Sequence, residues 1–79
     1  MKYVYILQSE ASEEHFYVGL TDDVLARLAA HNTGRVTHTS KFVPWRLKNV
    51  VGFADENRAI AFERYLKSGS GRAFAKKHF

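Results

Sequence analysis

The stretch YVYILQSEASEEHFYVGL, residues 3–20, decides the fold that we expect for this chain. Its two ends, residues 3–7 and 16–20, are rich in the β-branched and aromatic side chains that favour strands. Residues 8–14 between them are polar and typical of a turn. The stretch therefore predicts a β-hairpin at the start of the protein.

Four more elements are predicted after this hairpin. They are a helix from Val24 to about Asn32, a strand over 45–53, a helix from Asp55 to about Ser68 and a short basic helix over 72–79. Residues 21–23 (Thr-Asp-Asp) and Asp55 offer side-chain oxygens that cap helix N-termini, and residues 69–71 (Gly-Ser-Gly) break the chain between the last two helices. We expect a single α+β domain over residues 1–79, with a small three-stranded antiparallel or mixed sheet flanked by helices in the order β-β-α-β-α-α.

Composition excludes several classes of protein. The chain has 79 residues and no cysteine, which excludes a disulfide framework, a thiolate metal site and a cysteine nucleophile. It shows no apolar run long enough to span a membrane and no signal peptide, so we expect a cytoplasmic protein without a membrane partner.

Positive charge is concentrated in two parts of the sequence. The net charge is +4, and no acidic residue occurs between Asp23 and Asp55 or after Glu63. Such segregation favours a basic face that binds nucleic acid, although a solvated basic surface is the alternative. A long polar loop over 35–44 also suggests a functional segment. The expected nucleic-acid contacts are Arg35, Lys41, Arg46, Lys67, Arg72, Lys76 and Lys77.

Glu63 breaks the pattern of its predicted helix. It falls inside the apolar arc, between Ala59 and Ile60, at 100° per residue. A carboxylate there is costly unless it is paired, hydrogen-bonded or bound to a metal. Two interpretations stay open: a residue at the rim of the core, paired with Arg64, Lys67 or a strand group, or a carboxylate held at the floor of a cleft.

Two further pairs of residues are candidates for a site. Arg27 and His31 are four residues apart, so they project from the same side of their helix, facing either solvent or a phosphate. Tyr5 and Tyr17 lie on adjacent predicted strands, where tyrosines are most often half-buried packing residues.

Residues 3–5 (Tyr-Val-Tyr) and, after eleven intervening residues, residues 17–19 (Tyr-Val-Gly) resemble the paired motif of the GIY-YIG nuclease superfamily. The resemblance continues in register, with Arg27 at the position of the family's helix arginine and His31 at that of its second tyrosine or histidine. Glu63 corresponds to the family's metal-binding carboxylate. The structural glycine of the motif is Gly19.

Three shorter segments, 39–41, 44–46 and 66–72, are similar to the small single-domain bacterial branch of predicted endonucleases. Two positions depart from the family pattern. Tyr3 replaces the glycine that opens the first motif, and Leu20 replaces a lysine found in several relatives.

The resemblance implies metal-dependent hydrolysis of DNA phosphodiester bonds, with RNA as an open alternative. Glu63 would hold one Mg²⁺ or Mn²⁺ ion, and a single carboxylate suits magnesium, which keeps several waters. Arg27 would neutralise charge on the phosphoryl oxygens. Tyr17 is the first choice for activating water, with Tyr5 positioning it, and His31 is the rival base.

So small a domain offers little surface for reading a long site, so we expect nonspecific or structure-preferring cleavage. Two alternatives stay open. One is a catalytically weak or inactive nucleic-acid-binding module, and the other is a nuclease subunit whose protein partner supplies substrate recognition. The oligomeric state is not predicted.

Overall fold

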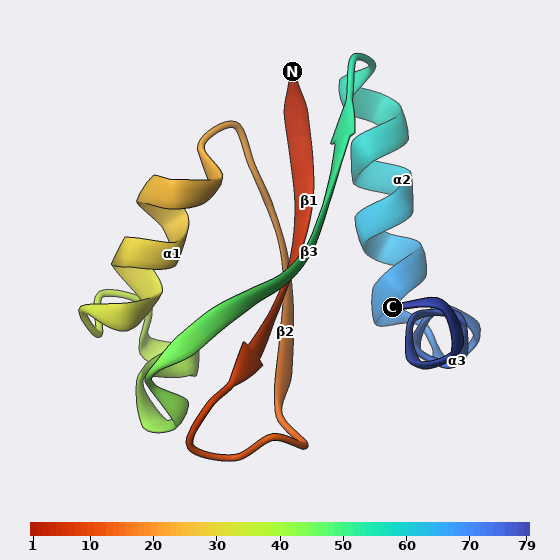
Figure 1. Cartoon of the computed structure of the whole chain (residues 1–79). Helices are drawn as coiled ribbons and strands as arrows, with labels where there is room; N and C mark the ends of the chain where they lie inside the picture. Colours follow the sequence, from red (N-terminus) through yellow and green to blue (C-terminus); the bar gives the residue numbers. More distant parts are fainter.

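The computed structural model describes all residues, 1–79, and confirms the α+β fold (Figure 1). The elements are β1 (Lys2–Ser9), β2 (Phe16–Thr21), α1 (Val24–Asn32), the 3₁₀ helix η1 (Thr37–Phe42), β3 (Trp45–Phe53), α2 (Glu56–Lys67) and α3 (Gly69–His78). The predicted loop over 35–44 is thus partly helical, because η1 lies within it. No helix combines the length and the apolar composition that crossing a membrane requires.

The three strands form one sheet in the order β2-β1-β3, and both strand pairs are antiparallel. The alternative of a mixed sheet is therefore excluded. Figure 1 shows α1 beside one face of the sheet and α2 with α3 beside the other. Strand β1 lies in the centre, and β2 and β3 form the two edges.

Strand β1 supplies both hydrophobic cores, because successive side chains of a strand point to opposite faces. The core towards α2 is formed by Val4, Ile6, Ala59 and Leu66. The core towards α1 is formed by Tyr5, Leu7 and Trp45. A tyrosine of the central strand is thereby buried between the sheet and α1, with only 1% of its surface exposed.

Capping side chains fix where the helices begin. Asp23 accepts a hydrogen bond from the backbone of Ala26 at the start of α1, and Asp55 caps α2, as predicted. The predicted break at residues 69–71 is wrong, because Ser68 caps α3 and these residues form its first turn. Gly71 allows this turn, since a Cβ there would overlap the carbonyl of Tyr65.

Candidate active site

Tyr5 reaches from the central strand across the edge strand. It is paired with Gly19 of β2, and a Cβ at position 19 would overlap the Tyr5 hydroxyl. Glycine is therefore required here for close approach of a side chain, and not for an unusual backbone angle. Gly19 therefore leaves room for the hydroxyl of Tyr5 to pass over β2 and reach α1.

That hydroxyl joins a buried chain of polar groups. The Tyr5 Oη lies 3.0 Å from His31 Nε2, and His31 Nδ1 lies 2.8 Å from Thr39 Oγ1. Thr39 Oγ1 donates to the carbonyl of Val36, so it accepts from His31 Nδ1–H. His31 Nε2 is then the acceptor for the Tyr5 hydroxyl proton. His31 is fully buried and Thr39 is 2% exposed, which excludes the interpretation of His31 as an exposed helix-end residue.

Burial and one cation shift the pKa values of these groups. Burial lowers the pKa of His31, and the positive charge of Arg27 lowers it further, so the imidazole is neutral at neutral pH. Burial also raises the pKa of Tyr5, although the nearby guanidinium of Arg27 opposes that effect. The same interaction with Tyr5 raises the pKa of Arg27. Two neutral groups and one permanent cation therefore form the inner part of the site.

Tyr17 packs against this inner part from β2. Its ring centroid lies 4.7 Å from that of His31 and 6.2 Å from that of Tyr5. The guanidinium of Arg27 contributes to the site from α1, next to both tyrosine hydroxyls. Tyr17 is half-buried, so it is the more accessible of the two tyrosines. The structure thus brings together four of the predicted site residues.

Glu63 approaches the same edge strand from α2. Its side chain is 19% exposed, and Oε2 lies 3.0 Å from Lys67 Nζ. Lys67 Nζ also lies 6.0 Å from the ring centroid of Tyr17, so this lysine links the carboxylate to the tyrosines. Glu63 therefore has the partner that a carboxylate at the rim of the core requires.

The donor set for a metal ion is one carboxylate. No group of three or more histidine, aspartate or glutamate side chains comes together in this structure. Magnesium and manganese fit such a position, because both prefer oxygen ligands, and magnesium is commonly completed by waters and substrate phosphates. Lys67 pairs with one oxygen of Glu63, so an ion would compete with it.

Residues 1–77 match the family model described as the GIY-YIG catalytic domain. The chain belongs to the GIY-YIG family. It is 39% identical over 66 residues to a UPF0213 protein of Lacticaseibacillus paracasei and 36% identical over 66 residues to one of Streptococcus pneumoniae. It is also 38% identical over 71 residues to the structure-specific endonuclease subunit SLX1 of the yeast Meyerozyma guilliermondii. The resemblance predicted from the motifs is confirmed.

These alignments cover most of this chain but less of its relatives. They include 82% of the chain in both bacterial cases and 81% in the yeast case. They span 72% of the Lacticaseibacillus protein, 65% of the streptococcal protein and 24% of the yeast subunit. What the relatives share with this chain is therefore the GIY-YIG domain.

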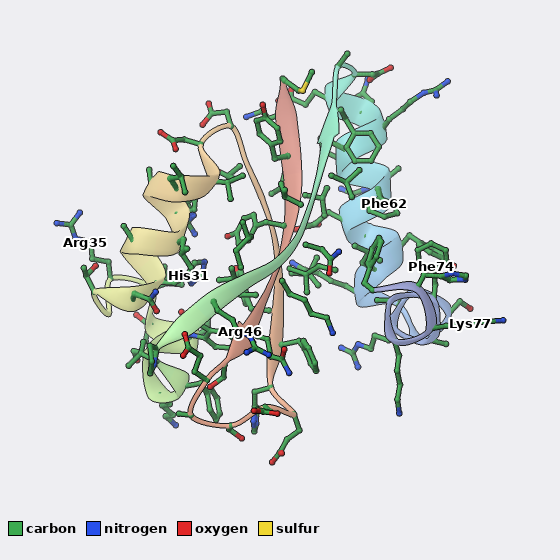
Figure 2. All side chains as sticks on the ribbon, viewed as in Figure 1. His31, Arg35, Arg46, Phe62, Phe74 and Lys77 are labelled. Atoms are coloured by element: carbon green, nitrogen blue, oxygen red, sulfur yellow. The ribbon has the colours of Figure 1, made fainter.

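The predicted nucleic-acid contacts are spread over several regions of the molecule. Arg35 and Lys77 lie on opposite sides of the molecule in Figure 2. Lys67, Arg72 and Lys76 line a groove beside α3. The remaining predicted cations lie elsewhere, Lys41 in η1 and Arg46 in β3, where its Nη2 donates to Gln8 Oε1 at 2.7 Å. The positive charge thus does not form one continuous face.

Thr39 is the site residue that sequence reasoning did not identify. It lies in η1, where its backbone carbonyl also accepts from Trp45 Nε1 at 2.9 Å. The indole and the imidazole together hold Thr39 in place beneath α1. Its sequence signals were indirect: its position in a long polar loop, and its place in the segment 39–41 that is similar to the bacterial branch.

Proposed function

We propose that this protein is a divalent-metal-dependent endonuclease that hydrolyses DNA phosphodiester bonds, with nonspecific or structure-preferring cleavage. The observation that carries the proposal is the position of Tyr17, whose ring packs against a neutral His31 while Arg27 and Lys67 flank it. A phosphate approaching this edge would meet cations and an accessible hydroxyl together. The names of the yeast relatives, structure-specific endonuclease subunits, agree with this chemistry.

Tyr17 is assigned to take the proton of the attacking water, which it can do only as a phenolate, after its own hydroxyl proton has left to solvent. Its rivals are already engaged, because the Tyr5 hydroxyl donates to His31 and both nitrogens of His31 are hydrogen-bonded. His31 is also fully buried, so it has no direct contact with water. In this proposal Tyr5 and His31 orient the ring of Tyr17, and they transfer no proton from the solvent themselves.

Arg27 is assigned to the phosphate. Its guanidinium lies beside the tyrosine hydroxyls and remains charged, so it can neutralise charge that develops on the phosphoryl oxygens. Glu63 would hold Mg²⁺ or Mn²⁺, and the bound ion would polarise the phosphate and stabilise the leaving oxygen. Lys67, which pairs with Glu63 here, would be released towards the substrate.

A second candidate function is nucleic-acid binding without cleavage. The ion pair between Glu63 and Lys67 favours it, because it already satisfies a half-buried carboxylate. A protein partner would then supply catalysis or substrate recognition, as the word subunit in the name of the yeast relative suggests. The two candidates differ in what Glu63 does.

The test is cleavage of branched, single-stranded and duplex DNA, and of the matching RNAs, in magnesium or manganese. Tyr17→Phe is expected to reduce cleavage by about 10²–10⁴-fold, the range typical of a lost acid–base group. Glu63→Gln is expected to remove metal-dependent cleavage, and neither change should weaken DNA binding. Glu56→Gln and Tyr65→Phe are the matched controls, since both residues are exposed on α2. Full activity of Tyr17→Phe would eliminate its assignment as the base. Salt-sensitive binding with no cleavage by the unmodified protein would support the second candidate.

A further inference from the structure

Helix α1 is apolar on both of its sides. Its inner side packs Val24 and Leu28 against the sheet. Its outer side presents Leu25, Ala26 and Ala29, all exposed, within an arc of about 100° at 100° per residue. A surface helix usually carries charged or polar residues on the side that faces away from the core, whereas a helix that is hydrophobic all round is buried. The outer side of α1 is therefore suited to be covered by another protein surface.

The apolar surface extends from α1 onto the neighbouring edge strand. Leu25 is 75% exposed, and it lines a hollow of about 390 Å³ together with Leu47 and Val50 of β3. These two β3 residues are 37% and 46% exposed. The outer side of α1 and the two β3 residues form one surface, which we call the α1 face. Contiguous exposed apolar surface of this kind marks a site of protein association.

Opposite charges mark the two ends of α1. Asp22 and Asp23 precede the helix, and the side chain of Asp22 is 76% exposed. Arg35 follows the helix and forms no ion pair in the structure. Figure 2 shows its side chain directed outward, away from the sheet. Asp23 and Arg35 are each six residues from Ala29, so an antiparallel copy of α1 centred on Ala29 would bring opposite charges together at both ends.

We propose that two copies of this chain associate through the α1 face, with the two α1 helices antiparallel about a twofold axis at Ala29. A second copy fits this face because one patch then supplies the apolar contact together with both the acid and the base, as a twofold interface requires. Arg35 would pair with Asp22 or Asp23 of the second copy.

The dimer leaves the candidate active site open. Tyr17 and Lys67 line the groove beside α3, and neither of them lines the hollow of the α1 face. Association and cleavage are therefore separate properties, and the inference does not depend on the proposed function.

Sedimentation equilibrium of the full chain over a wide concentration range tests the association. The mass is expected to rise from the 9.0 kDa of one chain to twice that value. Ala29→Arg is expected to hold the mass at that of one chain, because two like charges would meet at the axis. Ala61→Arg, at an exposed alanine of α2, is the matched control and is expected to leave the association unchanged.

Charge exchange and cross-linking test the orientation of the helices. Arg35→Glu and Asp22→Lys are each expected to raise the dissociation constant of the dimer about tenfold, because attraction becomes repulsion at both symmetric ends. The double variant Asp22→Lys/Arg35→Glu is expected to restore it. The chain has no cysteine, so Ala29→Cys supplies its only thiol and is expected to form a covalent dimer in a mild oxidant, whereas Ala61→Cys is not.

Two results would overturn the inference. One is the mass of a single chain for the unmodified protein at every concentration, which would leave the α1 face to a different protein. The other is a dimer that persists in Ala29→Arg, which would place the interface elsewhere. Circular dichroism identifies a variant that has not folded, and Arg35→Glu, which changes an exposed residue outside the helices, then decides. A dimer that Arg35→Glu weakens and the double variant restores would support the inference even if the protein cleaves no DNA.

Discussion

Replacing Gly19 by alanine is expected to destabilise the domain and to inactivate the site at once. The new methyl group would overlap the hydroxyl of Tyr5, and its distance to Cε1 of the same ring would be only 2.7 Å. The ring cannot turn into solvent, because Tyr5 is packed between the sheet and α1 with 1% exposure. The displacement must therefore break the hydrogen bond from Tyr5 to His31.

Two costs follow from that displacement. Forcing an extra carbon into a well-packed core costs about 1–3 kcal/mol. Leaving the buried His31 Nε2 without its donor costs about 1–3 kcal/mol more. Because both arise from one movement they are not additive, and we expect a loss of about 2–4 kcal/mol in the free energy of unfolding. That is a large part of the ~4–12 kcal/mol that a domain of this size has.

Urea denaturation and cleavage assays of the same preparations check this expectation. Gly69→Ala is the matched control, since no atom lies within 4 Å of the Cβ that it would add at the start of α3. The double variant Gly19→Ala/Tyr5→Leu should be less destabilised than the sum of its single variants, because leucine makes room for the methyl group. If Gly19→Ala is as stable as Gly69→Ala and still cleaves DNA, the proposed role of the glycine is refuted.

Two more predictions concern the buried polar chain. Thr39→Val should cost about 1–3 kcal/mol of stability and reduce cleavage, because Nδ1–H of His31 loses its acceptor. Thr39→Ser keeps the hydroxyl, so it should retain both stability and cleavage. A fully active valine variant would contradict the argument. The lowered pKa of His31 means that the folded state binds fewer protons than the unfolded state. The free energy of unfolding, measured from pH ~5 to ~8, should therefore be constant above the unfolded histidine pKa of ~6.5 and should decrease as the pH drops below that value. The decrease should be at most ~1.4 kcal/mol per pH unit, the limit for one proton. His31→Gln should remove this part of the pH dependence, and an unchanged slope in that variant would assign it to other groups.

Local sequence patterns predicted the strands and helices well, because each depends on neighbouring residues. The hairpin over 3–20 and the caps Asp23 and Asp55 lie where the alternation and the capping oxygens placed them. The start of α3 was misplaced, since two glycines near Ser68 resemble a break unless the serine is recognised as a cap. One of them, Gly71, is required by contact with the end of α2, which is a tertiary constraint.

The candidate site was predictable in part. Spacing along α1 placed Arg27 and His31 on one side, but helical periodicity alone left open whether that side was exposed. The structure places His31 at 0% exposure, and the reason is a contact with Thr39, which lies outside the helix. The position of Lys67 between Glu63 and Tyr17 likewise depends on how α2 packs beside β2.

Because β2 lies at the edge of the sheet, one part of the site is rigidly packed while another part stays open to a substrate. The inner half of the site is held by a central-strand tyrosine that is buried because Gly19 lets it pass across the edge. The outer half, Tyr17 and Lys67, lines the groove beside α3. A water-excluded part keeps the reacting groups oriented, while the open part admits a phosphate backbone. Changes at the inner half should therefore lower stability and activity together, whereas changes at the outer half, such as Arg72→Gln, should alter substrate binding at constant stability.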